Sequence, residues 1–498
     1  MHIVSTASTR RTLSLQVLAA CLTGLLIPLS FTGPAVALPA LSQVAGASPS
    51  ALNWVLNAYI LSYGSAMMVA GSLTDLLGRR RVWLAGLSVF CLATVAIACA
   101  SSVPLIAALR FVQGLGGAAA FAAAMSSLSP LFQGAARNQV MSLLGTTFGL
   151  GLAFGPLAAG AVLAVAPWPA IFYATAALGV MGFLLAGASV PQDPAHAGGR
   201  LDWPGALTFS GALGLLTVAL LLAPEHGWRS PWVLWPALAA LLLLAAFIRI
   251  EKGTAQPLLD LSLFRQRRFV GVQVLAASPA FLFIVLIVML PGRFIGVDGM
   301  APLAAGRLMM ALAAPLLLVP VLASMLLRWC SASLLCAAGL LLAAVGLVWL
   351  AMAGAATPWA LLVIGTGIGL PWGLMDAMAL NVVEADRAGM ATGIFNTVRV
   401  SADGVALAVA GAVLAGLIGI SLAESLPAGL PLAQAASRAA LGDLRQAAQL
   451  LPGNMELLRA SYDAAFRQLL LLLSALAVAT ALLLLYLLRQ ARPQASKP

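Results

Sequence analysis

Long apolar runs alternate with short polar segments along the whole chain. Each run reaches about 20 residues, which is the length that an α-helix needs to cross the hydrocarbon core of a bilayer. Charged residues, glycines and prolines separate the runs. Fourteen can be placed, at approximately 13–38, 52–74, 82–101, 103–129, 138–165, 168–189, 204–224, 231–250, 269–290, 301–327, 331–353, 358–382, 389–419 and 466–488. The pattern predicts an all-α membrane protein with fourteen transmembrane helices.

The composition strengthens this prediction. Of the 498 residues, 62% are apolar and 8% are charged, and the mean hydropathy is +1.03; a soluble protein carries about 25% charged residues. Too few residues lie outside the apolar runs to form a soluble catalytic domain. The 26 Lys and Arg residues exceed the 15 Asp and Glu residues, and most of them fall in loops on one side of the predicted membrane. Because basic loops face the cytoplasm, we expect both termini there and the chain in the inner membrane.

The sequence offers no catalytic or metal-binding pattern. Its two lysines, Lys252 and Lys497, do not follow a glycine, so there is no G-x-x-x-x-G-K-[ST] loop to hold a nucleotide. The five cysteines form no CxxC pair and the three histidines are far apart in sequence. We therefore expect no enzyme, no metal and no cofactor, and energy for any transport must come from an ion gradient or a partner subunit.

A polar motif follows the second apolar run, where Gly71 to Arg81 reads G-S-L-T-D-L-L-G-R-R-R. Asp75 can accept hydrogen bonds from the start of a neighbouring helix, while the glycines allow close approach and a tight turn. An ordinary basic loop would explain the arginines but not the acid and glycines at these spacings. We predict a conformational latch that can be made and broken, formed by Gly71, Asp75, Gly78, Arg79 and Arg80.

This motif resembles the pattern G-x-L-x-D-x-x-G-R-[RK] between the second and third spans of the major facilitator superfamily. The segment from Leu105 to Ala119 resembles the fourth-span motif of that family, with Arg110, Gln113, Gly114, Gly116 and Ala118 in place. Gly151, Gly155, Pro156 and Gly160 match the fifth-span antiporter motif g-x-x-x-G-P-x-x-G-G, except that Ala159 replaces a glycine. The span count and several further segments resemble the fourteen-span drug:proton antiporter branch. Those segments are Trp54 to Tyr59, Asp202-Trp203-x-Gly205, Gly227-Trp228, Pro257 to Phe264, and Gly389-x-x-x-Gly393-x-x-Asn396-x-x-Arg399.

The resemblance implies two six-helix bundles built from inverted three-helix repeats, with a substrate cavity between them that opens to each side in turn. We expect the N-terminal bundle at 1–189, a linker with two inserted helices at 190–267 and the C-terminal bundle at 268–498. The long outer loop at about 421–465 has apolar residues near helical spacing from Leu432 to Leu451, then a turn at Pro452 to Asn454. We expect a helical hairpin there, either a passive connector or a docking site for a periplasmic adaptor.

Charged residues within the spans decide the predicted mechanism. A guanidinium inside a span costs at least ~2.5–3.5 kcal/mol on insertion scales, so Arg110 must face the protein interior or water. The family assigns this arginine to proton coupling, and we carry that role to Arg110; a static tether between helices is the alternative. The same two readings apply to Arg399.

Two acids at membrane depth, Asp376 and Asp403, are the candidate sites that exchange a proton for a cationic substrate. Asp403 lies four residues after Arg399 and could simply pair with it, while Asp376 could be solvated at a cavity mouth. Members of the branch often carry D-x-T-x-x-N-x-A-L-P in the first span, where this chain has Ser30 in place of the acid. The usual first-span proton site is therefore missing.

The predicted substrate cavity contains Ser30, Thr32, Gln113, Trp372 and Asn396. Trp372 precedes Asp376 by four residues, so the pair would offer an aromatic face and an anion to an amphipathic cation. The sequence favours a secondary transporter that exports amphipathic, drug-like small molecules by proton antiport. The alternatives are a metabolite-specific exporter or facilitator without proton coupling, and a non-transporting membrane sensor or assembly factor. Expected partners are the small molecule and membrane lipids, with no nucleic acid, and the chain is expected to be a monomer.

Overall fold

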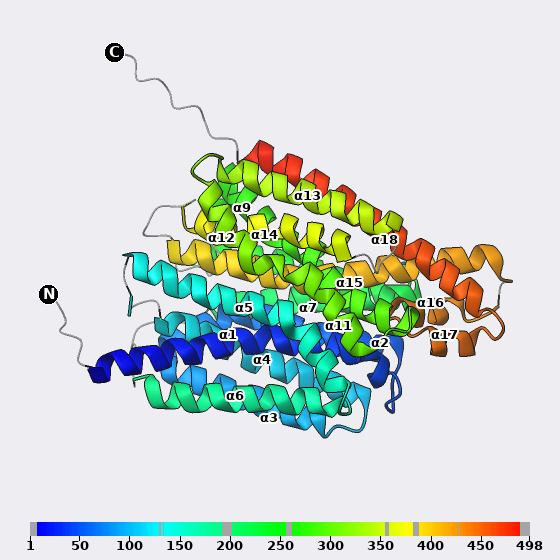
Figure 1. Cartoon of the computed structure of the whole chain (residues 1–498), viewed down its shortest axis with the longest axis horizontal. Helices are drawn as coiled ribbons and strands as arrows, with labels where there is room; N and C mark the ends of the chain where they lie inside the picture. The colour runs from blue at the N-terminus through cyan, green and yellow to red at the C-terminus, as the bar shows by residue number, and fades with distance from the viewer. Residues whose placement is uncertain are drawn as a thin grey trace, which may run out of the picture.

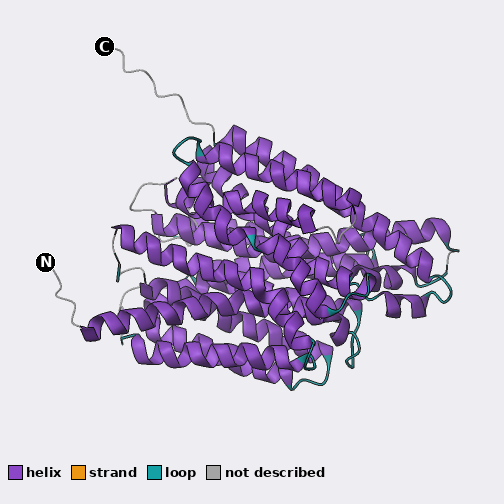
Figure 2. Cartoon of the chain, in the orientation of Figure 1, coloured by secondary structure: helices purple, strands orange, loops and turns teal. Residues whose placement is uncertain are grey.

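The computed structural model describes residues 7–128, 131–132, 134–191, 202–254, 261–353, 358–381, 388–427 and 429–488. Helices make up nearly all of this part of the chain, joined by short loops (Figure 2). The prediction of an all-α protein is confirmed.

Each predicted apolar run corresponds to one helix or to consecutive helical segments. The first six helices are α1 (Ala7–Leu41), α2 (Pro49–Leu77), α3 (Arg79–Ala98), α4 (Val103–Leu128), α5 (Gly134–Leu163) and α6 (Pro169–Ser189). Next come α7 (Trp203–His226), α8 (Pro231–Gly253) and the short 3-10 helix η1 (Leu261–Arg265). One long span is built from α9 (Arg267–Pro279), the π-helix η2 (Ala280–Ile284), α10 (Val285–Gly292) and the π-helix η3 (Arg293–Val297). The remaining helices are α11 (Pro302–Ala313), α12 (Pro315–Leu326), α13 (Ala332–Ala353), α14 (Pro358–Asn381), α15 (Ala388–Ser425), α16 (Leu432–Ala440), α17 (Leu444–Leu450) and α18 (Met455–Leu487).

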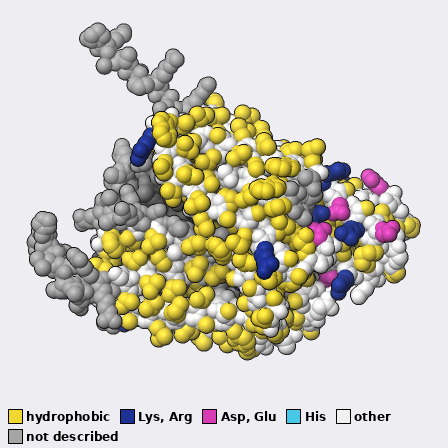
Figure 3. Space-filling model, in the orientation of Figure 1, with side chains coloured by type: hydrophobic (Ala, Val, Ile, Leu, Met, Phe, Trp, Pro, Cys, Tyr) yellow, Lys and Arg dark blue, Asp and Glu magenta, His cyan; other side chains and the backbone are white. Residues whose placement is uncertain are grey.

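Twelve helices among the described residues are long and apolar enough to cross a membrane, and α5 is a thirteenth when its two parts are taken as one span. The 29-residue helix α2 lies beside α4 in the same bundle, but the predicted number of fourteen spans is not confirmed exactly. Large apolar side chains on the outer helices face away from the protein; Trp232, Trp235 and Leu241 of α8 are each more than 60% exposed. Figure 3 shows hydrophobic side chains over the flanks of the helices. Such surfaces are stable only in lipid, and the chain is a multi-pass membrane protein.

The helices form two groups. Helices α1 to α6 pack on one another, and α9 to α15 pack with α18; we call these the N-terminal half and the C-terminal half. The halves meet where α5 contacts α11, α2 contacts α15 and α1 contacts α10. Helices α7 and α8 form an antiparallel pair, and α7 contacts α2 and α15, one from each half. The pair therefore lies beside the junction of the two halves.

The ends of the molecule differ. Figure 1 shows the start of α1 and the end of α18 at one end, which we call the terminal end. Helices α16 and α17 lie at the opposite end, the loop end, where charged side chains gather in Figure 3.

The segment between α15 and α18 differs from the expected hairpin. The spacing predicts one helix over 432–451, but the structure has two short ones, because Gly442 adopts a φ of 83° that other residues rarely adopt. Asp443 then caps α17 by accepting a hydrogen bond from the Gln446 amide at 3.2 Å. The second helix expected after the turn is the first part of α18, which begins at Met455.

Candidate functional site

Arg110 lies fully buried on α4, in the N-terminal half. Its Nε donates a hydrogen bond to the Val55 carbonyl of α2 at 2.9 Å, and its Nη1 donates one to Gln113 Oε1 at 2.6 Å. The guanidinium carbon lies 4.3 Å from the centre of the Tyr59 ring, a cation–π contact. Arg110 Nη2 has no hydrogen-bond partner in the part of the chain that the structure describes. A buried guanidinium with one unused donor is costly unless something else accepts from it.

Two further side chains extend this network to α1 and α3. Gln113 Nε2 donates to Thr94 Oγ1 of α3 at 2.7 Å, and the Tyr59 hydroxyl donates to the Ile27 carbonyl of α1 at 3.1 Å. Gln113 is fully buried. In this conformation both ends of the Gln113 amide hold neighbouring helices together, and its place in a substrate cavity stays a prediction.

Ser30 and Thr32 of α1 are also buried away from an open cavity. Ser30 Oγ donates to the Leu26 carbonyl and Thr32 Oγ1 to the Pro28 carbonyl, each at 2.9 Å. A hydroxyl within the membrane can make its hydrogen bond in this way, by donating to a carbonyl in the preceding turn of its own helix. Thr32 packs against Gly155 of α5, so the expected role of these two residues in a cavity is not seen in this conformation.

A row of aromatic rings leads from Arg110 to the other half. Tyr59 stacks on Tyr63 at 6.1 Å between ring centres, and the row continues through Phe121 and Phe148 with spacings of 6.5 and 5.7 Å. The Arg399 guanidinium of α15 lies 5.7 Å from the centre of the Phe148 ring and 4.8 Å from that of Trp372. Arg110 and Arg399 thus lie against opposite ends of this row of rings, and Arg399 links the row to Trp372 in the C-terminal half.

The sequence interpretation missed most of this row. Tyr59 and Tyr63 are four residues apart on α2, which places both rings on one face of that helix. Their spacing was the available signal, but it does not show which helix they face. Trp372, predicted to lie in the cavity, packs edge-on against Phe283 of η2 at 5.8 Å and is mostly buried.

Helices α2 and α15 cross closely where the two halves meet. A Cβ on Gly64 would lie 3.2 Å from Val400 Cγ1, and one on Gly404 would lie 3.3 Å from Ile60 Cγ2. Close packing of this kind needs residues without side chains on the facing surfaces. The crossing brings the polar groups of the two helices together.

Asp403 lies at this crossing, one turn after Arg399. It is partly exposed. Arg399 and Asp403 directly precede Val400 and Gly404, the α15 residues that pack on α2 beside Tyr63. The Tyr63 hydroxyl is buried without a hydrogen-bond partner among the described residues. A carboxyl, a phenol and a guanidinium therefore lie in the same region, at the junction of the halves. Asp376 and Asn396, the other residues predicted for this region, have side chains outside the described set.

The antiporter motif on α5 makes contacts in two directions. Gly151 and Gly155 face α1, whereas a Cβ on Gly160 would lie 2.5 Å from the Pro302 carbonyl oxygen at the start of α11. In return, a Cβ on Gly306 would lie 2.9 Å from the Pro156 carbonyl oxygen. Helix α5 bends by 43° between Leu152 and Phe154. The motif thus allows the two halves to touch backbone to backbone near the loop end.

A second contact between the halves lies outside the bundle. We call α16, the turn 441–443 and α17 the loop strap. Gln446 Nε2 donates to the Ser42 carbonyl between α1 and α2 at 2.6 Å, and Arg438 donates to Gln446 Oε1 and, at 3.4 Å, to the Ala47 carbonyl. The turn also packs on α10 and η3, where Gly442 faces Gly292 and Gly296. The loop strap therefore joins the C-terminal half to the N-terminal half at the loop end.

We expect Gln446→Ala to loosen the loop strap. The variant removes the bond to Ser42 and the acceptor of Arg438, and each such hydrogen bond is worth about 0.5–1.5 kcal/mol. Hydrogen–deuterium exchange of residues 432–451 should become several-fold faster. Gln449→Ala, on the exposed side of the same helix, is the control and should exchange as the unaltered protein does. Equal exchange in the two variants would contradict the assignment of Gln446 as a strap contact.

A charged cluster, also missed by the sequence interpretation, joins η3 to α18 at the loop end. Arg293 Nη2 donates to Asp463 Oδ1 at 2.7 Å, and its Nε lies 3.6 Å from Asp298 Oδ2. The same guanidinium lies 4.9 Å from the centre of the Phe466 ring. Burial raises the pKa of the Asp298 carboxyl, although the charge of Arg293 opposes this shift. The cluster fixes the outer turns of the long span against α18.

The family of the chain follows from its similarity to known proteins. The sequence pattern of the family described as Major Facilitator Superfamily matches residues 20–407, which is most of the chain. The chain belongs to the Major Facilitator Superfamily. The members of this superfamily are transporters and not enzymes, so the chain is a membrane transporter of this type.

Relatives within the Major Facilitator Superfamily include exporters of drugs and antibiotics. The chain is 28% identical over 402 residues to the multidrug resistance protein Stp of Mycobacterium tuberculosis, covering 80% of this chain and 75% of that protein. It is 30% identical over 410 residues to the cephamycin export protein CmcT of Amycolatopsis lactamdurans, covering 78% and 82%. The predicted resemblance to multidrug efflux transporters is confirmed.

Solved structures share the fold. A bacterial homologue of the human lysosomal transporter Spinster, in an inward-facing and unoccupied conformation, aligns with a TM-score of 0.66 at 15% identity, covering 96% of this chain and 97% of that one. The xylose transporter XylE from E. coli, in an inward open conformation, aligns with a TM-score of 0.56 at 16% identity, covering 96% and 97%. The Major Facilitator Superfamily fold expected from the motifs is therefore present.

The predicted latch of the superfamily lies at the terminal end, between α2 and α3. Gly78 ends α2 with a φ of 91° and its amide donates to the Thr74 carbonyl at 3.1 Å, so the tight turn expected of this glycine is present. Arg80 Nη2 donates to the Gly187 carbonyl of α6 at 2.7 Å. Among the described residues no atom lies within 4 Å of a Cβ built on Gly71, and the Asp75 side chain lies outside the described set. The making and breaking of the latch stays a prediction.

Proposed function

We propose that this transporter exports amphipathic small molecules from the cytoplasm in exchange for protons. The relatives include a multidrug resistance protein and a cephamycin exporter, which supports an outward direction and amphipathic cargo. The terminal end faces the cytoplasm in this proposal, because the basic loops predicted for that side favour it. The functional unit is one copy of the chain in lipid, acting on a small molecule and driven by the proton gradient.

The observation that carries the proposal is the crossing of α2 and α15 at the junction of the halves, the region in which Asp403, Tyr63 and Arg399 lie. A carboxyl at the junction of two rocking halves experiences a different environment in each conformation. It can therefore bind a proton from one side and lose it to the other. Arg110 contacts the same row of rings at Tyr59. A change of charge at the junction would therefore act on Arg110 through these rings.

Proton coupling is tested with Asp403→Asn in proteoliposomes, using ethidium as the transported cation and a pH-sensitive dye inside. We expect at least a tenfold loss of ethidium movement driven by a pH gradient, while exchange of internal for external ethidium persists, because the halves can still rock. Asp376→Asn is assayed alongside to identify a second acid. Glu424→Gln is the matched control, since Glu424 is an exposed acid on the same helix.

Full gradient-driven transport by Asp403→Asn would remove Asp403 from the coupling mechanism. A second candidate function, an exporter or facilitator without proton coupling, is favoured by Ser30. Its hydroxyl is bonded within its own helix, at the position where the first-span motif that this chain resembles often has an acid. Ethidium movement down its own gradient with no accompanying proton movement would support that function and exclude antiport.

A further inference from the structure

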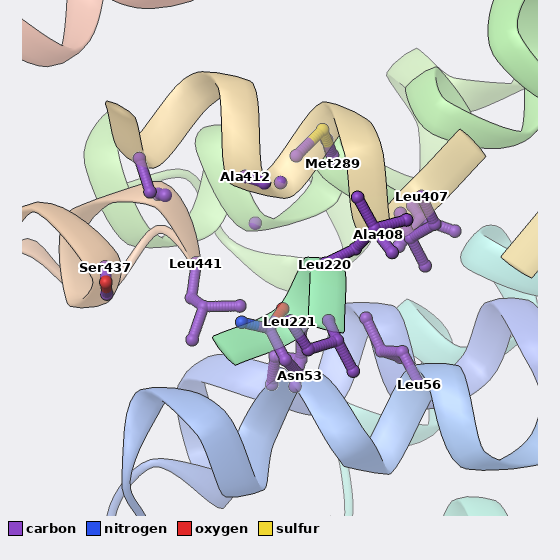
Figure 4. A pocket seen from close by; sticks show the side chains of 16 residues that line it. Asn53, Leu56, Leu220, Leu221, Met289, Leu407, Ala408, Ala412, Ser437 and Leu441 are labelled. Carbon is purple, nitrogen blue, oxygen red and sulfur yellow. The ribbon is translucent and has the colours of Figure 1, made fainter. Parts of the chain in front are cut away.

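The pocket shown in Figure 4 has room for water only. It lies at the loop end between α2, α7, α15 and α16, and its volume of about 40 Å³ holds a few water molecules. Leucine and alanine side chains form most of its wall. A drug-sized ligand must therefore contact the protein at another place, and a buried polar group in the C-terminal half marks one.

The side chain of Gln273 on α9 carries an amide that is used at neither end. The residue is 6% exposed, and its Nε2 and Oε1 are both buried without a hydrogen-bond partner among the described residues. In that part of the chain it is the one side chain whose buried donor and buried acceptor are both unpaired. Each unpaired group carries a desolvation cost that nothing in this conformation offsets. A partner from outside the chain would remove that cost.

The packing of α9 shows which side of the helix carries Gln273. A Cβ on Gly271 would lie 3.1 Å from Leu487 Cβ, so that side of α9 faces the end of α18. Gln273 comes two residues later, about 200° round the helix, and lies on the opposite side. Helix α18 runs along the edge of the molecule opposite to α3 and α6 (Figure 1). Gln273 therefore lies on the side of α9 that faces the interior.

The helices that pack on α9 carry residues of the candidate site. Helix α9 contacts α14 and α15, which carry Trp372 and Arg399. Phe283 of η2, farther along the same span, packs edge-on against Trp372, and the Arg399 guanidinium lies over the Trp372 ring. Gln273 precedes Phe283 along the span. It therefore lies nearer the terminal end than this cluster of two rings and a cation.

A break in the regular helix joins α9 to the rest of its span. Pro279 ends α9, and the π-helix η2 follows directly. Because proline removes a backbone hydrogen bond and a π-helix interrupts the α-helical pattern, a helix can bend at such a place. Beyond it, α10 and η3 contact α1 of the N-terminal half, whereas α9 packs on α14, α15 and α18 of its own half. Helix α9 can therefore tilt at Pro279 while the contact between the halves persists, and a tilt uncovers the Gln273 amide.

We propose that Gln273 is a specificity-determining residue of the substrate path, and that it binds cargo carrying a carboxamide or a lactam. In these groups a carbonyl oxygen and an N–H lie side by side, so the cargo can accept from Nε2 and donate to Oε1 at once. The proposal rests on the proposed export function and names one chemical class within its amphipathic cargo. Cargo without such a group, such as ethidium, still binds but gains nothing from Gln273.

The test compares two probes that differ by one carboxamide. Carbamazepine is an uncharged tricycle with a carboxamide, and iminostilbene is the same tricycle without it. Equilibrium binding to the full-length protein in phosphatidylcholine nanodiscs is measured without a pH gradient, and protein-free nanodiscs provide the background. Because two hydrogen bonds are lost, Gln273→Leu should weaken carbamazepine binding at least tenfold and iminostilbene binding less than twofold.

Ser278→Ala is the matched control. Ser278 is a second buried polar residue of α9, but its Oγ donates to the Leu275 carbonyl at 2.9 Å. Its hydroxyl donor is therefore already used within the helix. The affinity of this variant for carbamazepine should equal that of the unaltered protein.

Thermal unfolding without ligand separates recognition of cargo from a structural role. Leucine is close in size to glutamine and removes two unpaired polar groups, so Gln273→Leu should unfold at a higher temperature than the unaltered protein. If Gln273 instead held an ordered water or tethered a neighbouring helix, the variant would unfold at a lower temperature.

Three results would each overturn the proposal. They are a lower unfolding temperature of Gln273→Leu, an equal loss of affinity for both probes in that variant, and binding of carbamazepine to the unaltered protein that is no tighter than binding of iminostilbene. All of these measurements are made at equilibrium and without transport. Failure of the role of Gln273 is therefore distinguishable from failure of the export function, which the ethidium assay tests.

Discussion

Replacing Gly160 with leucine is expected to lower the rate of ethidium transport at least tenfold. A Cβ at this position would lie 2.5 Å from the Pro302 carbonyl oxygen and 3.3 Å from the Leu303 Cα. A leucine side chain therefore cannot fit unless α5 and α11 move apart. Overpacking of a close contact costs about 1–3 kcal/mol, which changes the ratio of two conformations roughly 5- to 150-fold. The state closed at the loop end would become rare, and a cycle that passes through it would slow accordingly.

The conformational change is measured directly by electron spin resonance distances. Spin labels at Ala164 and Ala301, both exposed at the loop end, should show a longer distance in Gly160→Leu than in the unaltered sequence. Ala158→Leu is the control, because Ala158 is exposed on the same helix. If Gly160→Leu transported at the normal rate with an unchanged distance distribution, closure at α5 and α11 would not be a step of the cycle.

Most of the helical architecture could be predicted because the bilayer imposes it. A span must bury its backbone hydrogen bonds within itself, so each apolar run became a helix. The errors lie where that constraint ends. Helices α15 and α18 extend past their apolar runs at the loop end, and Gly442 breaks a regular spacing for a reason found only in tertiary structure, its contact with Gly292.

The candidate site was predictable only in part. Arg110 could be predicted as a site residue because a charge within a span must be compensated. The structure shows that hydrogen bonds and the Tyr59 ring compensate it. Its partner, the Val55 carbonyl, carries no sequence signal at all. From sequence alone, the Ser30 hydroxyl could equally well face a cavity or bond to a carbonyl of its own helix. Tertiary packing decides between these two positions. The row of rings from Tyr59 to Phe148 joins three helices, and Arg399 links it to Trp372 on α14, so no local pattern reveals it.

Substituting Arg110 with lysine is expected to abolish gradient-driven transport, with a loss of at least a hundredfold. The arginine donates to Val55 and Gln113 from two different nitrogens while it lies over the Tyr59 ring. A lysine ammonium keeps the charge but cannot satisfy this planar, multidentate geometry. The acceptor left unpaired at Gln113 would also cost about 1–3 kcal/mol of stability. The thermal unfolding of the variant must therefore be measured together with its transport rate.

Thr94→Val separates the two roles proposed for Arg110. This variant breaks only the far end of the network, where Gln113 donates to Thr94, and leaves the guanidinium in place. If Arg110 takes part in proton coupling, Thr94→Val should lose about the same stability as Arg110→Lys while keeping most of its transport and its ethidium-induced proton release. If both variants lost activity in proportion to their loss of stability, Arg110 would be a static tether between α2 and α4, and proton coupling would rest on the other charged residues of the spans, Asp403, Asp376 and Arg399.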